Sequence, residues 1–153
     1  MNTTSAKIIQ ILDKSQVDYT LYEHTPVYTC EQAAKIRGIP LSEGIKALLI
    51  KVNKRGFILV LTRADQRLNL KKIRQIEGGK KIRFARPEEV KDIAGCDVGC
   101  VHPFINVKTY VDRILVETPH IEFNPARHDQ TIRLNTKDLL SLLKSPIYHD
   151  ISL

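Results

Sequence analysis

The sequence is short of cysteine and of long apolar runs. Three cysteines in 153 residues are an odd number, which fits a reducing compartment better than a disulfide framework. No apolar run approaches the roughly 18–20 residues that span a bilayer. The first residues also lack the charged-then-apolar pattern of a secretory signal. We therefore expect a cytoplasmic protein that makes no membrane contact.

The common catalytic motifs are also missing. The sequence contains no phosphate-binding glycine loop, no nucleophile elbow and no zinc-protease helix. It has no internal repeat, linker or low-complexity tract. A chain of 153 residues predicts a single domain over residues 1–153 that buries roughly 68–70% of its unfolded surface. Composition alone leaves the function open.

Basic residues are in clear excess. Lysine and arginine number 24 against 17 acidic residues, which gives a net charge of +7 and a pI of about 9.4. Such an excess favours a polyanionic partner such as nucleic acid, although a merely solvated basic face would look the same. The pairs Lys71-Lys72 and Lys80-Lys81 bracket the glycines Gly78-Gly79. Because the pairs lie on either side of this turn, they could form one contiguous patch for tRNA, or simply a solvated face.

Apolar periodicity and capping residues predict the secondary structure. Helices are expected at residues 5–15, 30–37, 69–77, 87–95 and 137–144. Strands are expected at residues 19–24, 45–52, 57–62, 81–84, 109–117, 120–123 and 131–134.

The strands at 45–52 and 57–62 form a predicted hairpin around the turn at residues 53–56. Both are nearly continuous apolar runs, so they should be central and covered on both faces. The tail from Ser145 is expected to be peripheral, although Ile147 and Ile151 could dock it. The fold class is therefore α+β, with a mixed, curved, barrel-like sheet surrounded by helices.

Two features of the sequence suggest a binding site. Glycine and proline disfavour regular structure over Gly95–Ile105, so this apolar stretch is interpreted as the wall of a pocket. Lys46 lies second in an apolar strand. Its side chain either reaches outward to solvent or points into a cleft, where it would hold a phosphate or carboxylate.

The cysteines and histidines allow several interpretations. Cys96, Cys100 and His102 suggest a metal site, but structural zinc requires a second pair of ligands that the sequence lacks. A Cys100–His102 nucleophile pair lacks an orienting third group. We therefore expect buried, apolar cysteines. His24 and His128 are interpreted as hydrogen-bonding structural residues, and residues 124–129 as either a functional loop or a solvated turn.

Several markers occur in a family-specific order between about Tyr19 and Leu143. They are Tyr22-x-His24, Ile45-Lys46-Ala47-Leu48-Leu49, Thr62 to Leu68, Gly95-x-x-x-Gly99-x-x-x-Pro103-Phe104 and Val111-Asp112. In this combination the chain resembles the YbaK-like aminoacyl-tRNA editing family, also called the prolyl-tRNA-synthetase-associated domain.

The resemblance implies a deacylase that acts in trans on mischarged tRNA, without metal or cofactor. A partner synthetase, and a monomeric or homodimeric state, remain open. Attack by a positioned water, assisted by the neighbouring ribose hydroxyl, is the implied mechanism. Lys46 would hold the tRNA 3′ end or position the ester, and Gly99 would present backbone groups to the aminoacyl moiety. The implied substrate-binding residues are Tyr22, His24, Tyr28, Ala47, Cys100, Val101, His102, Pro103 and Asn124.

Three departures from the family pattern bear on specificity. Ala47 stands where threonine is frequent, and Cys100 replaces the second glycine of a Gly-Gly pair. Asn124 begins a polar segment in place of a later glycine-rich loop. These changes weaken the case for cysteinyl-tRNA and make alanine, serine or threonine equally suitable acyl groups, with Asn124 as a candidate selector. The alternative is a catalytically inactive tRNA-binding or regulatory module of the same fold.

Overall fold

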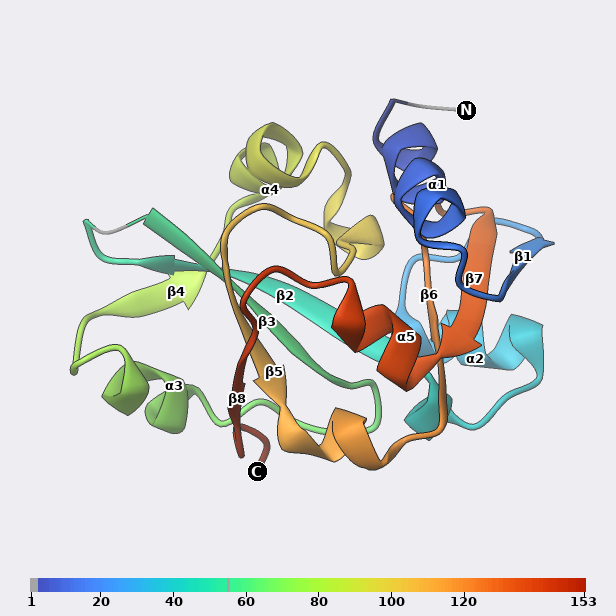
Figure 1. The fold of residues 1–153 in the computed structure, drawn as a ribbon. Coiled ribbons are helices and arrows are strands. Elements are labelled where there is room, and N and C mark those ends of the chain that lie inside the picture. The colour runs from blue at the N-terminus through green and yellow to red at the C-terminus, as the bar shows by residue number, and fades with distance from the viewer. Residues whose placement is uncertain (1–2, 55) are drawn as a thin grey trace.

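The computed structural model describes residues 3–54 and 56–153. It contains two β-sheets that lie side by side, with helices around them (Figure 1). The α+β class predicted from the sequence is confirmed. Met1, Asn2 and Arg55, which fall within the expected domain and the expected hairpin turn, lie outside the described residues.

The smaller sheet is antiparallel. Its strand order is β1 (Tyr19–Glu23), β7 (Gln130–Asn135) and β6 (His120–Phe123). Tyr22 pairs with Thr131, which brings the N-terminal segment onto the C-terminal half of the chain.

The larger sheet is mixed. Its strands lie in the order β4 (Ile82–Phe84), β2 (Ile45–Val52), β3 (Gly56–Arg63), β5 (Lys108–Asp112) and β8 (Ile147–His149). The β2–β3 hairpin is antiparallel, as predicted, whereas β5 is parallel to both β3 and β8. Leu59 and Leu61 join one hydrophobic cluster while Ile58 and Val60 join another. Because side chains alternate between faces, β3 is covered on both sides, as expected.

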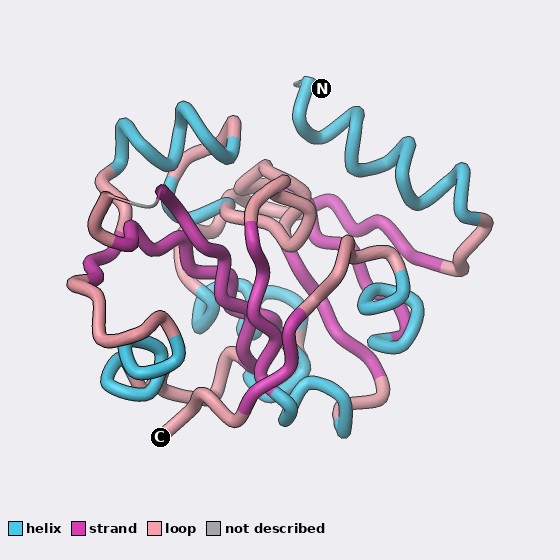
Figure 2. The backbone as a smooth tube through the Cα atoms, turned by 60° about the vertical axis from the view of Figure 1, so that its left-hand side comes forward, coloured by secondary structure: helices cyan, strands magenta, loops and turns pink. Residues whose placement is uncertain are grey.

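Local sequence signals fix the helix ends. The helices are α1 (Thr3–Ser15), α2 (Cys30–Arg37), α3 (Leu70–Ile76), α4 (Pro87–Ala94) and α5 (Thr136–Ser141). The side chains of Thr29 and Asn69 accept backbone hydrogen bonds at the starts of α2 and α3, and Pro87 opens α4. Figure 2 shows the helices outside the strands. None of the helices in the described part of the chain is long and apolar enough to cross a membrane.

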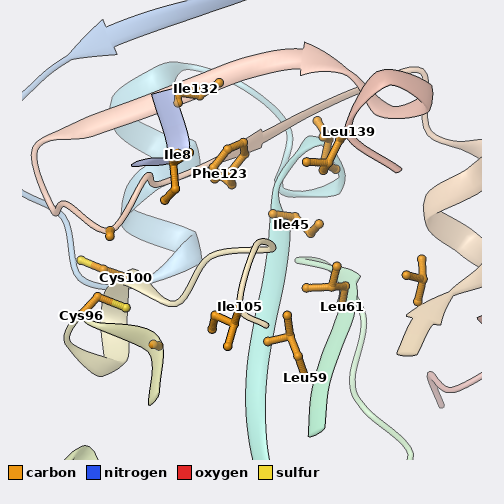
Figure 3. Packing of buried hydrophobic residues seen from close by; sticks show 14 of the residues in the cluster. Ile8, Ile45, Leu59, Leu61, Cys96, Cys100, Ile105, Phe123, Ile132 and Leu139 are labelled. Atoms are coloured by element: carbon orange, nitrogen blue, oxygen red, sulfur yellow. The ribbon is translucent and has the colours of Figure 1, made fainter. Parts of the chain in front are cut away.

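One buried cluster joins the two sheets. It combines Ile45, Leu59 and Leu61 of the larger sheet with Phe123 and Ile132 of the smaller one. Figure 3 shows these side chains with Ile8 of α1 and with Cys96, Cys100 and Ile105 of the loop after α4. The cysteines and Ile105 therefore anchor the loop 95–105 to the hydrophobic core.

Three expectations about the fold are wrong. The sheets do not close into a barrel, because β1, β7 and β6 form a separate sheet. The strand predicted at residues 109–117 ends at Asp112, and Arg113–Glu117 is a 3-10 helix. The expected peripheral tail instead supplies the edge strand β8, and Ile151 is fully buried, as its apolar character allowed.

Candidate functional site

The loop after α4 forms one wall of a cavity. Gly95 ends α4 with a φ of +67°, in the left-handed region that favours glycine. A 3-10 turn follows at Val98–Cys100. A Cβ atom on Gly99 would lie 2.9 Å from the carbonyl oxygen of Tyr28 and 3.3 Å from Cε1 of His128. Glycine is therefore needed at position 99 for the loop to approach the segment before α2 this closely.

Lys46 of β2 lines the same cavity. Its side chain is half-buried, and Nζ donates a hydrogen bond to the carbonyl oxygen of Gln66 at 3.1 Å. Within the described residues, no carboxylate forms an ion pair with this ammonium group. A positive charge satisfied only by a neutral carbonyl is available to an anionic or strongly polar ligand.

The cavity has a volume of about 640 Å³, within the range of about 300–1,000 Å³ typical of small-molecule sites. Segments far apart in the sequence meet there. The structure brings six of the predicted site residues to its lining, namely Tyr28, Lys46, Ala47, Gly99, Val101 and Asn124.

A much smaller cavity, of about 30 Å³, adjoins the first. Both are lined by Cys30, Ile45, Phe123 and Asn124. Burial raises the pKa of the Cys30 thiol, and the Lys46 ammonium opposes this effect, which puts Cys30 in the electrostatic reach of Lys46. The smaller cavity has room for only a few heavy atoms.

Hydrogen bonds fix the orientation of Asn124 at the junction of the two cavities. Its Nδ2 atom donates to the carbonyl oxygen of Gln130 at 2.7 Å and lies 3.5 Å from Oγ1 of Thr131. That hydroxyl lies 2.7 Å from Nε2 of His24, whose Nδ1 faces the carbonyl oxygen of Thr25 at 2.8 Å. Because a carbonyl only accepts, Nδ1 of His24 donates, Nε2 accepts from Thr131, and Thr131 accepts from Asn124. Oδ1 of Asn124 is the end of the amide that these bonds leave unengaged.

The remaining predicted site residues lie elsewhere. Tyr22 and His24 do not line either cavity. The guanidinium group of Arg37 lies 3.4 Å from the ring centroid of Tyr22 and also forms a bidentate ion pair with buried Glu122. Tyr22 thus helps to hold α2 against the small sheet, and His24 acts through Thr131.

His102 and Pro103 are buried under the loop instead of facing the cavity. Nδ1 of His102 accepts a hydrogen bond from the backbone N–H of Phe104 at 3.1 Å, so Nε2 carries the proton that faces the carbonyl of Ala94. Burial lowers the pKa of His102 to about 4. A neutral imidazole therefore braces the loop from within.

Cys100 is also buried, and its partner is His128. Sγ of Cys100 lies 3.1 Å from Nδ1 of His128, a ring that also contacts the carbonyl oxygen of Val27 at 3.0 Å and the carboxylate of Asp97 at 3.3 Å. Burial raises the pKa of Cys100 to about 12 and so keeps the thiol protonated. Among the described residues, no group of three or more His, Cys, Asp or Glu side chains is placed to hold a metal, and Cys96, Cys100 and His102 form no such group.

Sequence reasoning missed the position of His128. Its ring lies 4.5 Å from that of Tyr28 and, together with Tyr28 and Asp97, forms a wall between the larger cavity and another one of about 530 Å³. The polar composition of residues 124–129 was the only signal in the sequence. The partners of His128 lie about 30 and 100 positions away along the chain, so no local motif could reveal them.

Comparison with known proteins gives a consistent picture. A family model described as an aminoacyl-tRNA editing domain matches residues 24–142. The "Multifunctional Ser/Thr-tRNA deacylase ProXp-y" of Escherichia coli K12 is 32% identical over 148 residues, covering 92% of this chain and 89% of the relative. The "Prolyl-tRNA editing protein ProX" of Acetoanaerobium sticklandii is 30% identical over 146 residues, covering 90% and 89%.

Solved structures share the fold over nearly their whole length. One, titled "hypothetical protein APE2540", superimposes with a TM-score of 0.86 at 26% identity and covers 96% of this chain and 99% of that chain. A second, described as a candidate trans-editing enzyme for prolyl tRNA synthetase, has a TM-score of 0.84 at 24% identity and covers 100% and 99%.

Proposed function

Because the chain belongs to the aminoacyl-tRNA editing domain family, we propose that it is a trans-editing deacylase. It would hydrolyse the ester that joins a small amino acid, namely alanine, cysteine, serine or threonine, to the 3′ end of a mischarged tRNA, with tRNA(Pro) or a related tRNA as carrier. A synthetase pocket separates amino acids that differ by one methylene group by only about 10–200-fold, so a second hydrolytic site is needed.

The observation that carries the proposal is the pairing of a large cavity, which holds the unpaired ammonium of Lys46, with an adjoining space of about 30 Å³. The larger cavity suits the terminal ribose and adenine. The smaller one suits an amino acid side chain of a few atoms and excludes bulky residues by size. Its mouth is lined by Cys30 and Phe123.

The polarity at that mouth favours a hydroxyl group on the substrate. Asn124 presents Oδ1 as an acceptor while its Nδ2 is held by Gln130 and Thr131. A seryl or threonyl side chain can donate a hydrogen bond to this oxygen, whereas an alanyl side chain cannot. A buried acceptor without a donor is unfavourable by about 1–3 kcal/mol, so we propose that seryl and threonyl esters are preferred.

In the proposed reaction, water attacks the ester carbonyl carbon, the bond to the ribose oxygen breaks, and that oxygen takes a proton. The neighbouring ribose hydroxyl assists the water. Lys46 positions the 3′ end as a point charge, and the wall at Gly99 lets backbone groups approach the aminoacyl moiety. Positioning and electrostatic stabilisation then supply most of the rate.

A screen of the purified protein against alanyl-, cysteinyl-, seryl- and threonyl-tRNA tests the proposal. We expect release of the amino acid from at least one of them, with the seryl or threonyl ester hydrolysed fastest. Folded protein that hydrolyses none of the four would contradict the proposal. Salt-dependent tRNA binding without turnover would instead indicate an RNA-binding module.

A further inference from the structure

A second cavity lies next to the proposed active site. Its volume is about 530 Å³, and it shares Tyr28, Asp97 and His128 with the larger cavity of about 640 Å³. It extends from this shared wall to Lys91 on α4 and Arg127 in the loop after β6. The two cavities therefore adjoin each other along Tyr28, Asp97 and His128.

The side chain at the boundary is suited to stacking. Tyr28 is 59% exposed, although aromatic side chains of this size are usually well buried. Its ring leans against His128, with the planes inclined by 40°. Exposed aromatic rings next to basic residues are the usual platforms on which proteins stack the bases of single-stranded nucleic acid.

The charges in the second cavity fit a base better than a phosphate. Lys91 and Arg127 offer hydrogen-bond donors, whereas Asp97 and Asp129 offer acceptors. Arg127 is held by Asp129 through two hydrogen bonds of 2.8 Å, so its charge is already balanced. The same pair balances the charge of Asp129, which leaves Lys91 and Asp97 with opposite charges, so a bare phosphate gains no net attraction here. A cytosine presents an amino donor and ring acceptors on one edge and can use both kinds of group.

We infer that this second cavity binds the cytidine that precedes the terminal adenosine of tRNA, with its base against Tyr28 and its edge towards Lys91 and Asp97. The inference rests on the proposed function, since it requires the terminal adenosine in the larger cavity. Every tRNA ends in the same CCA sequence, so the subsite increases affinity for tRNA ends without selecting among tRNAs.

Esters of increasing length test the inference. The amino acid that is hydrolysed fastest in the tRNA screen is attached to adenosine alone, to the trinucleotide CCA, and to a CCA analogue whose middle nucleotide lacks its base. One stacked base is worth about a tenfold gain in binding. We therefore expect kcat/KM to be about tenfold higher for the CCA ester than for the adenosine ester, and to fall back for the analogue without the base.

A second test of the inference reverses one charge in the second cavity. Lys91→Glu should lower the ratio of kcat/KM between the CCA and adenosine esters towards one, whereas Lys137→Glu, the same change on α5 and outside both cavities, should keep the wild-type ratio. Equal kcat/KM for the two esters in the wild type would overturn the inference. Full activity on the analogue without the base would also overturn it, because the backbone alone would then be bound. Hydrolysis of the adenosine ester reports separately on the proposed function.

Discussion

Two lysines of the larger sheet differ in whether a carboxylate balances their charge. Lys108 of β5 lies beside Ile58 of β3, and Lys46 of β2 lies opposite Thr62 of the same strand. Nζ of Lys108 is 2.8 Å from a carboxylate oxygen of Glu77, whereas Nζ of Lys46 reaches only a neutral carbonyl. One sheet thus carries a paired and an unpaired lysine.

The paired lysine belongs to the structure. Glu77 is buried, and the Tyr110 hydroxyl donates to the same oxygen that Lys108 contacts. Hydrogen bonding to Glu77 raises the pKa of Lys108 and so keeps it charged. The difference between the two sites shows that charge balance distinguishes a stabilising lysine from one that is available to a ligand, although both lie on strands of the same sheet.

The largest expected effect comes from removing the unpaired charge. Lys46→Ala should lower kcat/KM for deacylation by roughly 100–1,000-fold, the usual loss when one electrostatic contact to the reacting group is removed. Thermal unfolding should barely change, because Lys46 forms no ion pair with any residue that the structure describes. Lys46→Arg should restore little activity, since a planar fork does not replace a point charge. A large drop in melting temperature would show that Lys46 is structural after all.

Removing the carboxylate from the paired site should have the opposite outcome. Glu77→Ala leaves Lys108 without its partner and Tyr110 without an acceptor. Breaking a buried pair costs about 3–5 kcal/mol, and the half-exposed Lys108 side chain (47%) places this site at the lower end. We expect the free energy of unfolding in urea to fall by about 3 kcal/mol, with deacylation by the folded fraction unchanged. Loss of activity without loss of stability would reverse the contrast.

The stability of the protein should also depend on pH, because the buried side chain of His102 stays neutral in the fold. The pKa of His102 is about 4 in the folded protein against about 6.5 in an unfolded chain. The unfolded state therefore binds more protons between these values, and stability falls as the pH drops from about 6.5 towards 4. We expect a loss of about 2 kcal/mol between pH 7 and pH 5, measured by urea unfolding. His102→Gln should flatten this dependence, and an unchanged slope in the variant would assign it to other groups.

The smallest expected effect concerns the acyl group. Asn124→Ala removes the proposed acceptor for a substrate hydroxyl and should lower the ratio of seryl to alanyl hydrolysis by about tenfold, which corresponds to about 1.4 kcal/mol. Thr131→Val should have the same direction with a smaller size, because it only loosens the orientation of Asn124. The measurement is kcat/KM for both esters on one tRNA. An unchanged ratio would assign selection to the size of the small cavity alone.

The sequence alone predicted those site residues that differ in character from their neighbours along the chain. Lys46 is conspicuous in an apolar strand, and the glycines of the loop 95–105 are conspicuous in an apolar loop. Lys46 and Gly99 both line the larger cavity. The hairpin and the helix caps at Thr29 and Asn69 also follow from short-range rules.

Features that depend on distant partners could not be predicted in this way. The apolar residues Ile114–Val116 suggested a longer β5, but Asp112 accepts hydrogen bonds from Thr62 and from the backbone of Ile151, and the chain leaves the sheet there. His128 gains its position from Val27, Asp97 and Cys100. Likewise, only the fold shows that His102 is buried and that Asn124 is oriented by Thr131.

The central claim is that the unpaired ammonium of Lys46 serves the substrate. A structure of the protein with a seryl-adenosine analogue, in which an amide replaces the ester, tests this most directly. We predict that Nζ of Lys46 lies about 3 Å from an oxygen of the analogue, with the seryl side chain in the small cavity beside Asn124. An analogue bound elsewhere, or one bound with no oxygen in hydrogen-bond reach of Nζ of Lys46, would contradict the account.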